Sequence, residues 1–222
     1  PSHSKETMRG GSELASTSET SQDGLALDYA TAWSYGRTES LNLLIPDFMG
    51  GDSGRAFTRD GEMAKALKPY GLESFAEQLP AYWGEQPYTA GPTYLGAAAL
   101  FLALLGLLLA SGRNKWWIAA VSLLTLLLAW GHNFMGFTEF AFKYLPGYNK
   151  FRTVSMALVV VEWTVPLLAA LALMPLWRGE VPRRKLLRAL AWAGGITGGF
   201  CLLFAVAGSA IFDFGRTEAA DF

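Results

Sequence analysis

Cysteine and histidine are scarce in this 222-residue sequence, which has one cysteine, Cys201, and two histidines. A single cysteine can form no disulfide within the chain, and the sequence has no zinc-binding pattern. The net charge is −1, and no basic stripe with interleaved aromatic residues occurs, so a nucleic-acid partner is not indicated. Nucleotide-binding loops and nucleophile elbows are missing as well. The function must be sought in other features.

Hydrophobic residues make up 51% of the chain, and they are concentrated after residue 92. A helix that crosses a membrane needs roughly 20 mainly apolar residues. Apolar stretches predict four such helices, at 93–111, 116–131, 154–177 and 189–212. We therefore expect an α-helical polytopic membrane protein, with a transmembrane region at 93–222. It follows an extracytoplasmic segment, 1–92, of mixed and loop-rich structure.

The short loops between these stretches indicate the orientation in the membrane. Loops 112–115 and 178–188 carry an excess of Lys and Arg, which is typical of the cytoplasmic side. Segment 1–92 and loop 132–153 then face outward, and the first of these has seven Lys and Arg against thirteen Asp and Glu. The chain begins without Met or a signal-peptide pattern. We therefore expect a fragment of a larger protein, whose upstream part exports segment 1–92.

Glu162 lies about nine residues into the third apolar stretch, roughly 13 Å deep at 1.5 Å per residue. A carboxyl group at that depth is costly unless it faces protein or water. It fits a functional polar cavity or a hydrogen-bonded packing position. Pro166, four residues later, removes a backbone donor and predicts a kink. In the fourth stretch, the glycine pairs 194/198 and 195/199 predict close helix packing within the chain or in a dimer.

The outer loop carries a short amphipathic stretch, 137–145, that we expect to lie in the membrane surface. Beyond it, Lys150 and Arg152 place two cations at the outer mouth of the third helix, against the usual charge bias. They indicate a bound anion such as a phosphate, or simple contact with lipid headgroups. His132 is a candidate general base or metal ligand, although a lone interfacial histidine is more often neither.

The polar segment contains two candidate ligand-binding stretches. Arg9, with the two glycines that follow it and Glu13, resembles an anion-holding turn. Residues 28–35 mix Asp28 with aromatic residues, including Trp33. That mixture suits sugar binding through stacking and hydroxyl contacts, and it equally suits the core of a small exported fold.

Several longer strings carry a family resemblance. They are TMRGGSEL (7–14), DYATAWSYG (28–36), LLIPDFMGG (43–51), YWG (82–84), QP (86–87), GP (91–92), NFMG (133–136) and YNKFRTVS (148–155). Through these strings the chain resembles the bacterial YfhO-type integral membrane protein family in its Bacteroidetes-like form. That family is similar to the GT-C glycosyltransferases, which take sugars from polyprenyl-phosphate donors on the outer face of the membrane.

The resemblance implies a multi-pass protein of the bacterial inner, or cytoplasmic, membrane, and a fragment of a GT-C-like fold. Its implied partners are the lipid bilayer, a lipid-linked sugar donor and an acceptor glycan of the cell envelope. GT-C enzymes usually carry their catalytic acid in the first outer loop, so we expect that acid outside this chain. No cofactor is evident, although the complete protein could use a divalent metal.

The resemblance also suggests roles for single residues in sugar transfer. Cations that could hold the donor phosphate are Arg9, Lys150 and Arg152, and residues that could contact sugar are Glu13, Asp28 and Trp33. Glu162 sits where that family's acidic residue is expected. Two alternatives stay open. A transporter or flippase would use Glu162 in a pathway and Pro166 in a broken helix, and a non-catalytic scaffold would dock a partner on its exported segment.

Overall fold

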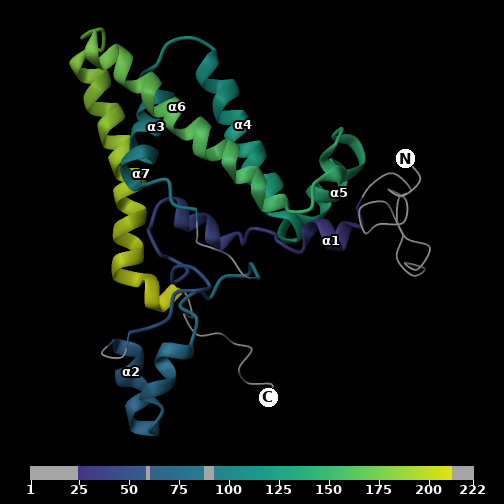
Figure 1. Ribbon diagram of the computed structural model, residues 1–222. Helices are drawn as coiled ribbons and strands as arrows, with labels where there is room; N and C mark the ends of the chain where they lie inside the picture. The colour runs from purple at the N-terminus through teal and green to yellow at the C-terminus, as the bar shows by residue number, and fades with distance from the viewer. Residues whose placement is uncertain (1–24, 59–60, 88–92, 212–222) are drawn as a thin grey trace, which may run out of the picture. The chain divides into compact units, whose positions relative to one another are not determined.

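The computed structural model describes residues 25–58, 61–87 and 93–211, and this part of the chain is helical without β-strands (Figure 1). The longer helices are α3 (Ala97–Leu109), α4 (Asn114–Ala129), α5 (Met135–Tyr144), α6 (Leu158–Trp177) and α7 (Arg183–Ile211). Shorter helices are α1 (Leu27–Thr31) and α2 (Glu62–Leu67), with 3₁₀ turns η2 (Thr38–Leu43), η3 (Lys68–Tyr70), η4 (Glu73–Gln78), η5 (Gly131–Phe134), η6 (Tyr148–Lys150) and η7 (Val154–Ala157). The predicted mixed structure of segment 1–92 is therefore short helices and loops where it is described.

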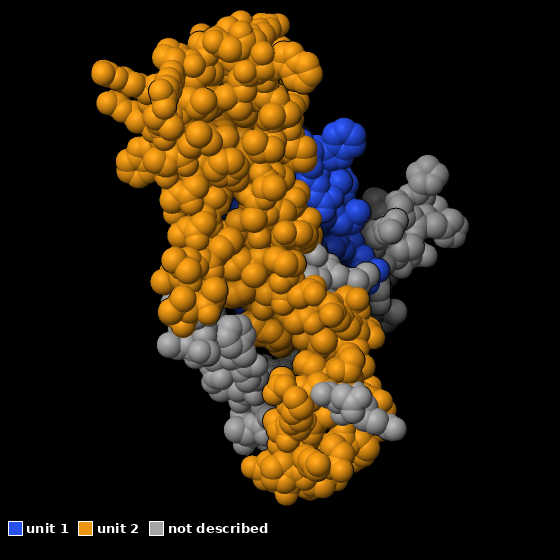
Figure 2. All heavy atoms as spheres, turned by 90° about the vertical axis from the view of Figure 1, so that its left-hand side faces the viewer, with its two compact units in different colours: residues 1–37, 85–87, 120–163 blue, residues 38–84, 88–119, 164–222 orange. Residues whose placement is uncertain are grey.

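The chain forms two compact units, coloured separately in Figure 2. Unit 1 comprises residues 1–37, 85–87 and 120–163, and unit 2 comprises residues 38–84, 88–119 and 164–222. The boundary falls within α4 and within α6, so each of these helices contributes residues to both units. Neither unit coincides with the division at residue 92 that hydropathy alone suggests.

Two helices of the described chain are long and apolar enough to cross a membrane, Val154–Trp177 and Arg183–Ala207. By length and composition they match the third and fourth predicted membrane helices. The first of them continues as one helix through Pro166 and Pro175. A third crossing is possible if α4 and the helical stretch Gly131–Tyr144 form one broken span, because this pair meets the same criteria but bends by 112°.

The first predicted span is shorter in the structure than hydropathy suggests, whereas the second keeps its length and begins two residues earlier. The N–H groups of Leu95 and Gly96 donate to the carbonyl of Leu43, so α3 begins only at Ala97. Its 13 residues measure about 20 Å at 1.5 Å per residue, against about 30 Å of hydrocarbon. α4 has 16 residues and ends before the bend at Gly131. Tertiary hydrogen bonds, which hydropathy cannot detect, thus accompany the late start of α3.

The core of unit 2 lies where α3, α7 and the second half of α6 pack together, as Figure 1 shows. It is built from Leu105 and Leu109 of α3 with small residues opposite: Ala172, Ala189 and Ala193. Gly106 lies so close to α6 that a Cβ atom there would overlap the carbonyl oxygen of Leu168. Small residues therefore set the approach of the two helices.

Only part of the close packing predicted for the glycines of α7 occurs within the described chain. A Cβ atom at Gly194 would lie 3.9 Å from the ring of Phe101. At Gly195, Gly198 and Gly199 it would meet no atom of the described chain within 4 Å. A helix partner from outside the chain, as in a dimer, stays a prediction for these three glycines.

Candidate functional site

In unit 1, the segment after α1 holds the turn between α4 and α5. The N–H of Tyr35 donates to the carbonyl of Ala129 over 2.8 Å, and the N–H of His132 donates to Ser34 Oγ over 2.9 Å. Gly131 has φ +48°, and a Cβ atom there would overlap Ser34 Oγ. Only glycine allows both this backbone conformation and this close approach. The turn is therefore placed by a segment nearly a hundred residues away in sequence.

The Arg152 guanidinium lies over two aromatic rings of the α1 region. Its Cζ atom is 5.1 Å from the ring centroid of Tyr29 and 4.9 Å from that of Trp33. The two aromatic residues are four positions apart, which brings them to one side of a helical turn. Trp33 is held by Pro87, whose carbonyl accepts from Nε1 over 2.8 Å, and by Ser155, whose N–H donates to the Trp33 carbonyl over 3.3 Å.

This arrangement orients a cation without neutralising it. Stacking uses the flat face of a guanidinium and leaves its in-plane N–H donors for an oxygen ligand. Those donors match the geometry of phosphate or carboxylate oxygens. The Arg152 side chain is exposed, so an anion can reach it. Arg152 can therefore bind an anion while its position is set by Tyr29 and Trp33.

An apolar cavity lies next to Arg152 in unit 1. It has a volume of about 280 Å³, and it is lined by Leu128, Tyr148, Phe151, Thr153, Val154, Met156, Ala157 and Val159. Phe151 and Thr153 flank Arg152, and both have extended backbone torsions. Side chains alternate along an extended backbone. Consistent with this, the neighbours of Arg152 line the cavity while Arg152 lies over the α1 aromatic rings.

Tyr148 is a polar residue of this cavity, as is Thr153, and it is buried. Burial raises the pKa of its hydroxyl to about 12, because the apolar surroundings disfavour the phenolate. The hydroxyl donates to the carbonyl of Leu128 over 2.9 Å. Tyr148 therefore serves as a neutral hydrogen-bonding residue at ordinary pH, and it leaves the cavity without charge.

His132 lies in a polar cluster of the same unit. Its Nδ1 is 3.1 Å from the carbonyl oxygen of Thr31, and its Nε2 is 4.0 Å from Glu85 Oε2. Asn133 Nδ2 donates to the same Glu85 oxygen over 2.6 Å and to the carbonyl of Tyr35 over 3.1 Å. The Arg37 guanidinium donates to the carbonyl of Asn133. Imidazole and carboxylate are thus held side by side at an accessible position.

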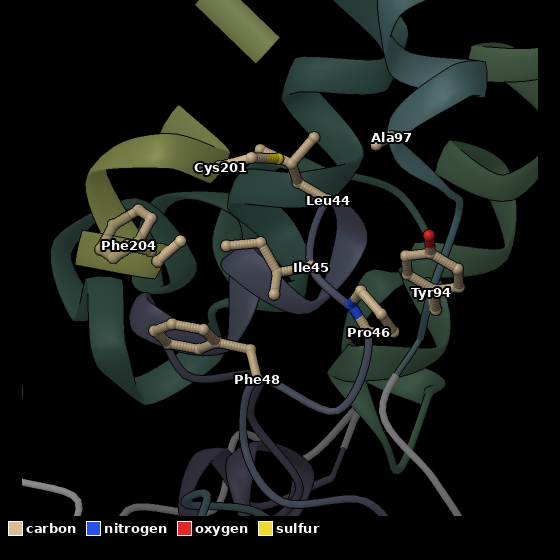
Figure 3. Close-up of a pocket in the computed structure, with 9 residues that line it drawn as sticks. Leu44, Ile45, Pro46, Phe48, Tyr94, Ala97, Cys201 and Phe204 are labelled. Atoms are coloured by element: carbon tan, nitrogen blue, oxygen red, sulfur yellow. The ribbon is translucent and has the colours of Figure 1, made fainter. Parts of the chain in front are cut away.

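Unit 2 has an apolar cavity of its own, shown in Figure 3. Its volume is about 320 Å³, and its lining residues come from the segment after η2, the start of α3 and the end of α7: Leu44, Ile45, Pro46, Phe48, Tyr94, Ala97, Cys201, Phe204 and Ala205. Such a lining suits a hydrocarbon group. The cavity offers few polar atoms that could orient a reacting group, so catalysis is better sought in unit 1.

The structure brings some of the predicted site residues together and leaves others apart. Trp33 and Arg152 are in contact. The side chains of Asp28, Lys150 and Glu162 are exposed and make no hydrogen bond or ion pair with either of them. Arg9 and Glu13 lie outside the described residues. The predicted sugar and phosphate positions thus converge in one pair, to which the structure adds Tyr29.

Sequence reasoning missed Glu85 as a partner of His132. Glu85 is 48 residues from Asn133, and it follows the Tyr-Trp-Gly string without any pattern that marks a catalytic acid. His132 itself was recognisable, but only as a lone histidine. In the described residues no group of three or more His, Cys, Asp or Glu forms a metal site. The divalent metal suggested for a complete enzyme stays a prediction.

Comparison with known proteins adds no relative. No protein-family model, curated protein or solved structure matches this chain. The apolar helices identify a membrane-embedded α-helical protein. The resemblance to YfhO-type proteins stays a prediction from the sequence strings.

Proposed function

We propose that this chain is part of a YfhO-like membrane protein that acts as an outer-face glycosyltransferase. It would transfer sugar from a polyprenyl-phosphate donor to an acceptor in the cell envelope. The family resemblance suggests this reaction class. The arrangement around Arg152 supports it, because the donor carries an anionic phosphate and Arg152 is an exposed cation positioned by Tyr29 and Trp33.

The observation that carries the proposal is the stacking of the exposed Arg152 guanidinium on Tyr29 and Trp33. The stacked guanidinium keeps its in-plane N–H donors, so it can bind the donor phosphate. During transfer the phosphate gains negative charge as it leaves the sugar, and a fixed cation stabilises that charge. Lys150, two residues earlier and exposed, can add a second positive charge.

Sugar contacts follow from the same arrangement. Trp33 is part of the site through its contact with Arg152, and Asp28 is an exposed carboxylate adjacent to Tyr29. Aromatic faces and carboxylates are the groups that bind sugar C–H surfaces and hydroxyls. We therefore expect Trp33 and Asp28 to contact the transferred sugar.

A transfer assay tests the proposal. Membranes that contain the protein are given radiolabelled polyprenyl-phosphate sugars, and label is followed into larger products. Arg152→Ala should raise the donor KM about 10- to 100-fold, because charge-assisted hydrogen bonds contribute about 1.5–3 kcal/mol. Arg152→Lys should recover only part of this loss, since an ammonium lacks the flat stacking face. Lys143→Ala is the matched control, because Lys143 also lies over an aromatic ring, that of Tyr144.

Other results would contradict the proposal. Label transfer that is equal in wild type and in Arg152→Ala would remove Arg152 from the donor site. Absence of transfer from any donor, in correctly inserted protein, would overturn the glycosyltransferase assignment. A flipping or uptake activity lost in Glu162→Gln would then favour transport, because Glu162 is an exposed carboxyl on the spanning helix α6.

A further inference from the structure

The orientation of His132 fixes which of its nitrogens can act as a base. A carbonyl oxygen can only accept a hydrogen bond, so Nδ1, 3.1 Å from the Thr31 oxygen, must carry a hydrogen. In the neutral ring the lone pair is then on Nε2. This nitrogen faces the Glu85 carboxylate at 4.0 Å. The His132 side chain is 44% exposed, so a substrate hydroxyl can approach Nε2.

Glu85 is fixed independently of His132. Its Oε2 accepts from Asn133 Nδ2 over 2.6 Å, and that amide is itself held by the Tyr35 carbonyl. A carboxylate in this position stabilises an imidazolium ion when Nε2 gains a proton. Backbone and side-chain contacts therefore hold a base and its counter-charge together before any substrate binds.

The pair belongs to the framework that also holds Arg152. Thr31, whose carbonyl positions the imidazole, lies between Tyr29 and Trp33 in sequence. The segment that carries Glu85 is joined to Trp33 through the hydrogen bond from Nε1 to Pro87. The same short stretches of unit 1 thus place the candidate phosphate-binding cation and the imidazole.

From this geometry we infer that His132 is the general base of the transfer reaction, with Glu85 as a positioning residue. This inference rests on the proposed function. The acceptor O–H bond breaks and its proton moves to His132 Nε2, while the acceptor oxygen forms a bond to the anomeric carbon. The bond from that carbon to the phosphate oxygen breaks, and its electron pair leaves with the lipid phosphate. Glu85 balances the imidazolium charge until the exposed ring returns the proton to water.

The assignment of His132 as the general base differs from the prediction made from the sequence, which placed the catalytic acid outside this chain. Within the described residues of unit 1, His132 combines an accessible ring nitrogen, a fixed tautomer and a carboxylate partner. Asp28 is also exposed, but none of the contacts of the described residues positions its carboxylate. The histidine is therefore the better-oriented base.

His132→Asn separates the catalytic role from the structural one. The Asn amide nitrogen occupies roughly the place of Nδ1 and can still donate to Thr31, but the variant has no nitrogen in place of Nε2. We expect kcat to fall about 10²- to 10⁴-fold, the usual contribution of a general base, with the donor KM and the unfolding temperature nearly unchanged. In His132→Ala kcat should fall by a similar factor, and added imidazole should restore part of the lost activity.

Glu85→Gln tests the positioning role. Gln can still accept from Asn133, but it lacks the charge that stabilises imidazolium. We expect kcat to fall up to about fivefold, which corresponds to the upper end of the range for an exposed ion pair, and the donor KM to stay unchanged. Glu77→Gln, an acidic residue of unit 2, is the control and should transfer label like wild type.

The outcomes separate this inference from the proposed function. If His132→Asn transfers label at the wild-type rate, the assignment of His132 as the base is overturned, but the proposed glycosyltransferase function is not. Loss of activity in His132→Asn together with a large drop in unfolding temperature, and no rescue of His132→Ala by imidazole, would show a structural role and overturn the assignment too. Failure of wild type to transfer from any donor would overturn both.

Discussion

At the residue scale, Tyr148 shows how burial alters a single group. Its pKa is raised to about 12 in the folded protein, whereas an exposed tyrosine in an unfolded chain ionises near 10. Between these values the folded state binds the proton more tightly than the unfolded state. The stabilisation is therefore fully present below about pH 10 and is lost as the pH rises through about 12.

The expected result is a free energy of unfolding that falls between pH 10 and pH 12, and falls less steeply in Tyr148→Phe. At neutral pH the variant should be less stable by about 1 kcal/mol, because the hydrogen bond to Leu128 is lost. Unfolding of the detergent-solubilised protein across this pH range is the measurement. Tyr144→Phe, at an exposed position, should retain the wild-type profile, and an identical profile for Tyr148→Phe would contradict the prediction.

The residues of the candidate site differ in how far sequence could identify them. Arg152 and Trp33 were recognisable because a cation on the outer side and an acidic–aromatic string are locally unusual. Their contact was not, because no local pattern relates residues more than a hundred positions apart. Glu85 lacked even a local signal. Its role depends on the fold, which brings it to His132 and Asn133.

At the element scale, the packing of α3 against α6 depends on Gly106. Gly106→Ala would place a methyl group on the carbonyl oxygen of Leu168. We expect the helices to separate and the protein to lose about 1–3 kcal/mol of stability, as is usual for overpacked cores. Retention of stability under thermal unfolding in detergent would show that α3 and α6 do not approach this closely.

Gly198→Ala is the matched control for this experiment. A Cβ atom at Gly198 meets no atom of the described chain within 4 Å. Alanine there should therefore be tolerated in the isolated protein, and its higher helix propensity should even stabilise α7 by up to about 1 kcal/mol. A clear loss of stability in Gly198→Ala would instead indicate a partner helix on that face of α7, as the glycine pairs predict for a dimer.

Helix lengths also show where hydropathy succeeds and where it fails. α6 and α7 coincide with long apolar runs, because every residue of a spanning helix contributes to the local average. The shortening of α3 came from hydrogen bonds between Leu95, Gly96 and the distant Leu43. The bend at Gly131 came from a positive φ angle and the contact with Ser34. Neither effect changes the average hydropathy of the segment.

At the scale of the whole molecule, the predicted orientation can be tested by cysteine labelling. Cys201 is the sole cysteine of this sequence, so Cys201→Ser provides a background for single cysteines in the loops. A membrane-impermeant maleimide should label Pro146→Cys in intact cells. It should label Ser111→Cys and Glu180→Cys only after permeabilisation, because the basic loops are expected to face the cytoplasm.

The same labelling experiment shows whether the bent helix pair crosses the membrane. If α4 and Gly131–Tyr144 form one broken span, Ser111→Cys and Pro146→Cys will be labelled from opposite sides. If the bent pair is a re-entrant loop, both will be labelled from the same side. Labelling of Glu180→Cys in intact cells would overturn the predicted orientation, whichever form the bent pair takes.

The sequence by itself determined the class of this protein. Long apolar runs, basic short loops and an acidic first segment are sums over neighbouring residues, so they indicate a multi-pass helical membrane protein without knowledge of the fold. The tertiary structure decided how many helices are long enough to cross, and which side chains meet. Arg152 over Tyr29 and Trp33, and His132 beside Glu85, depend on contacts between distant segments. Those contacts follow from packing and hydrogen bonding in three dimensions, which no local sequence average contains.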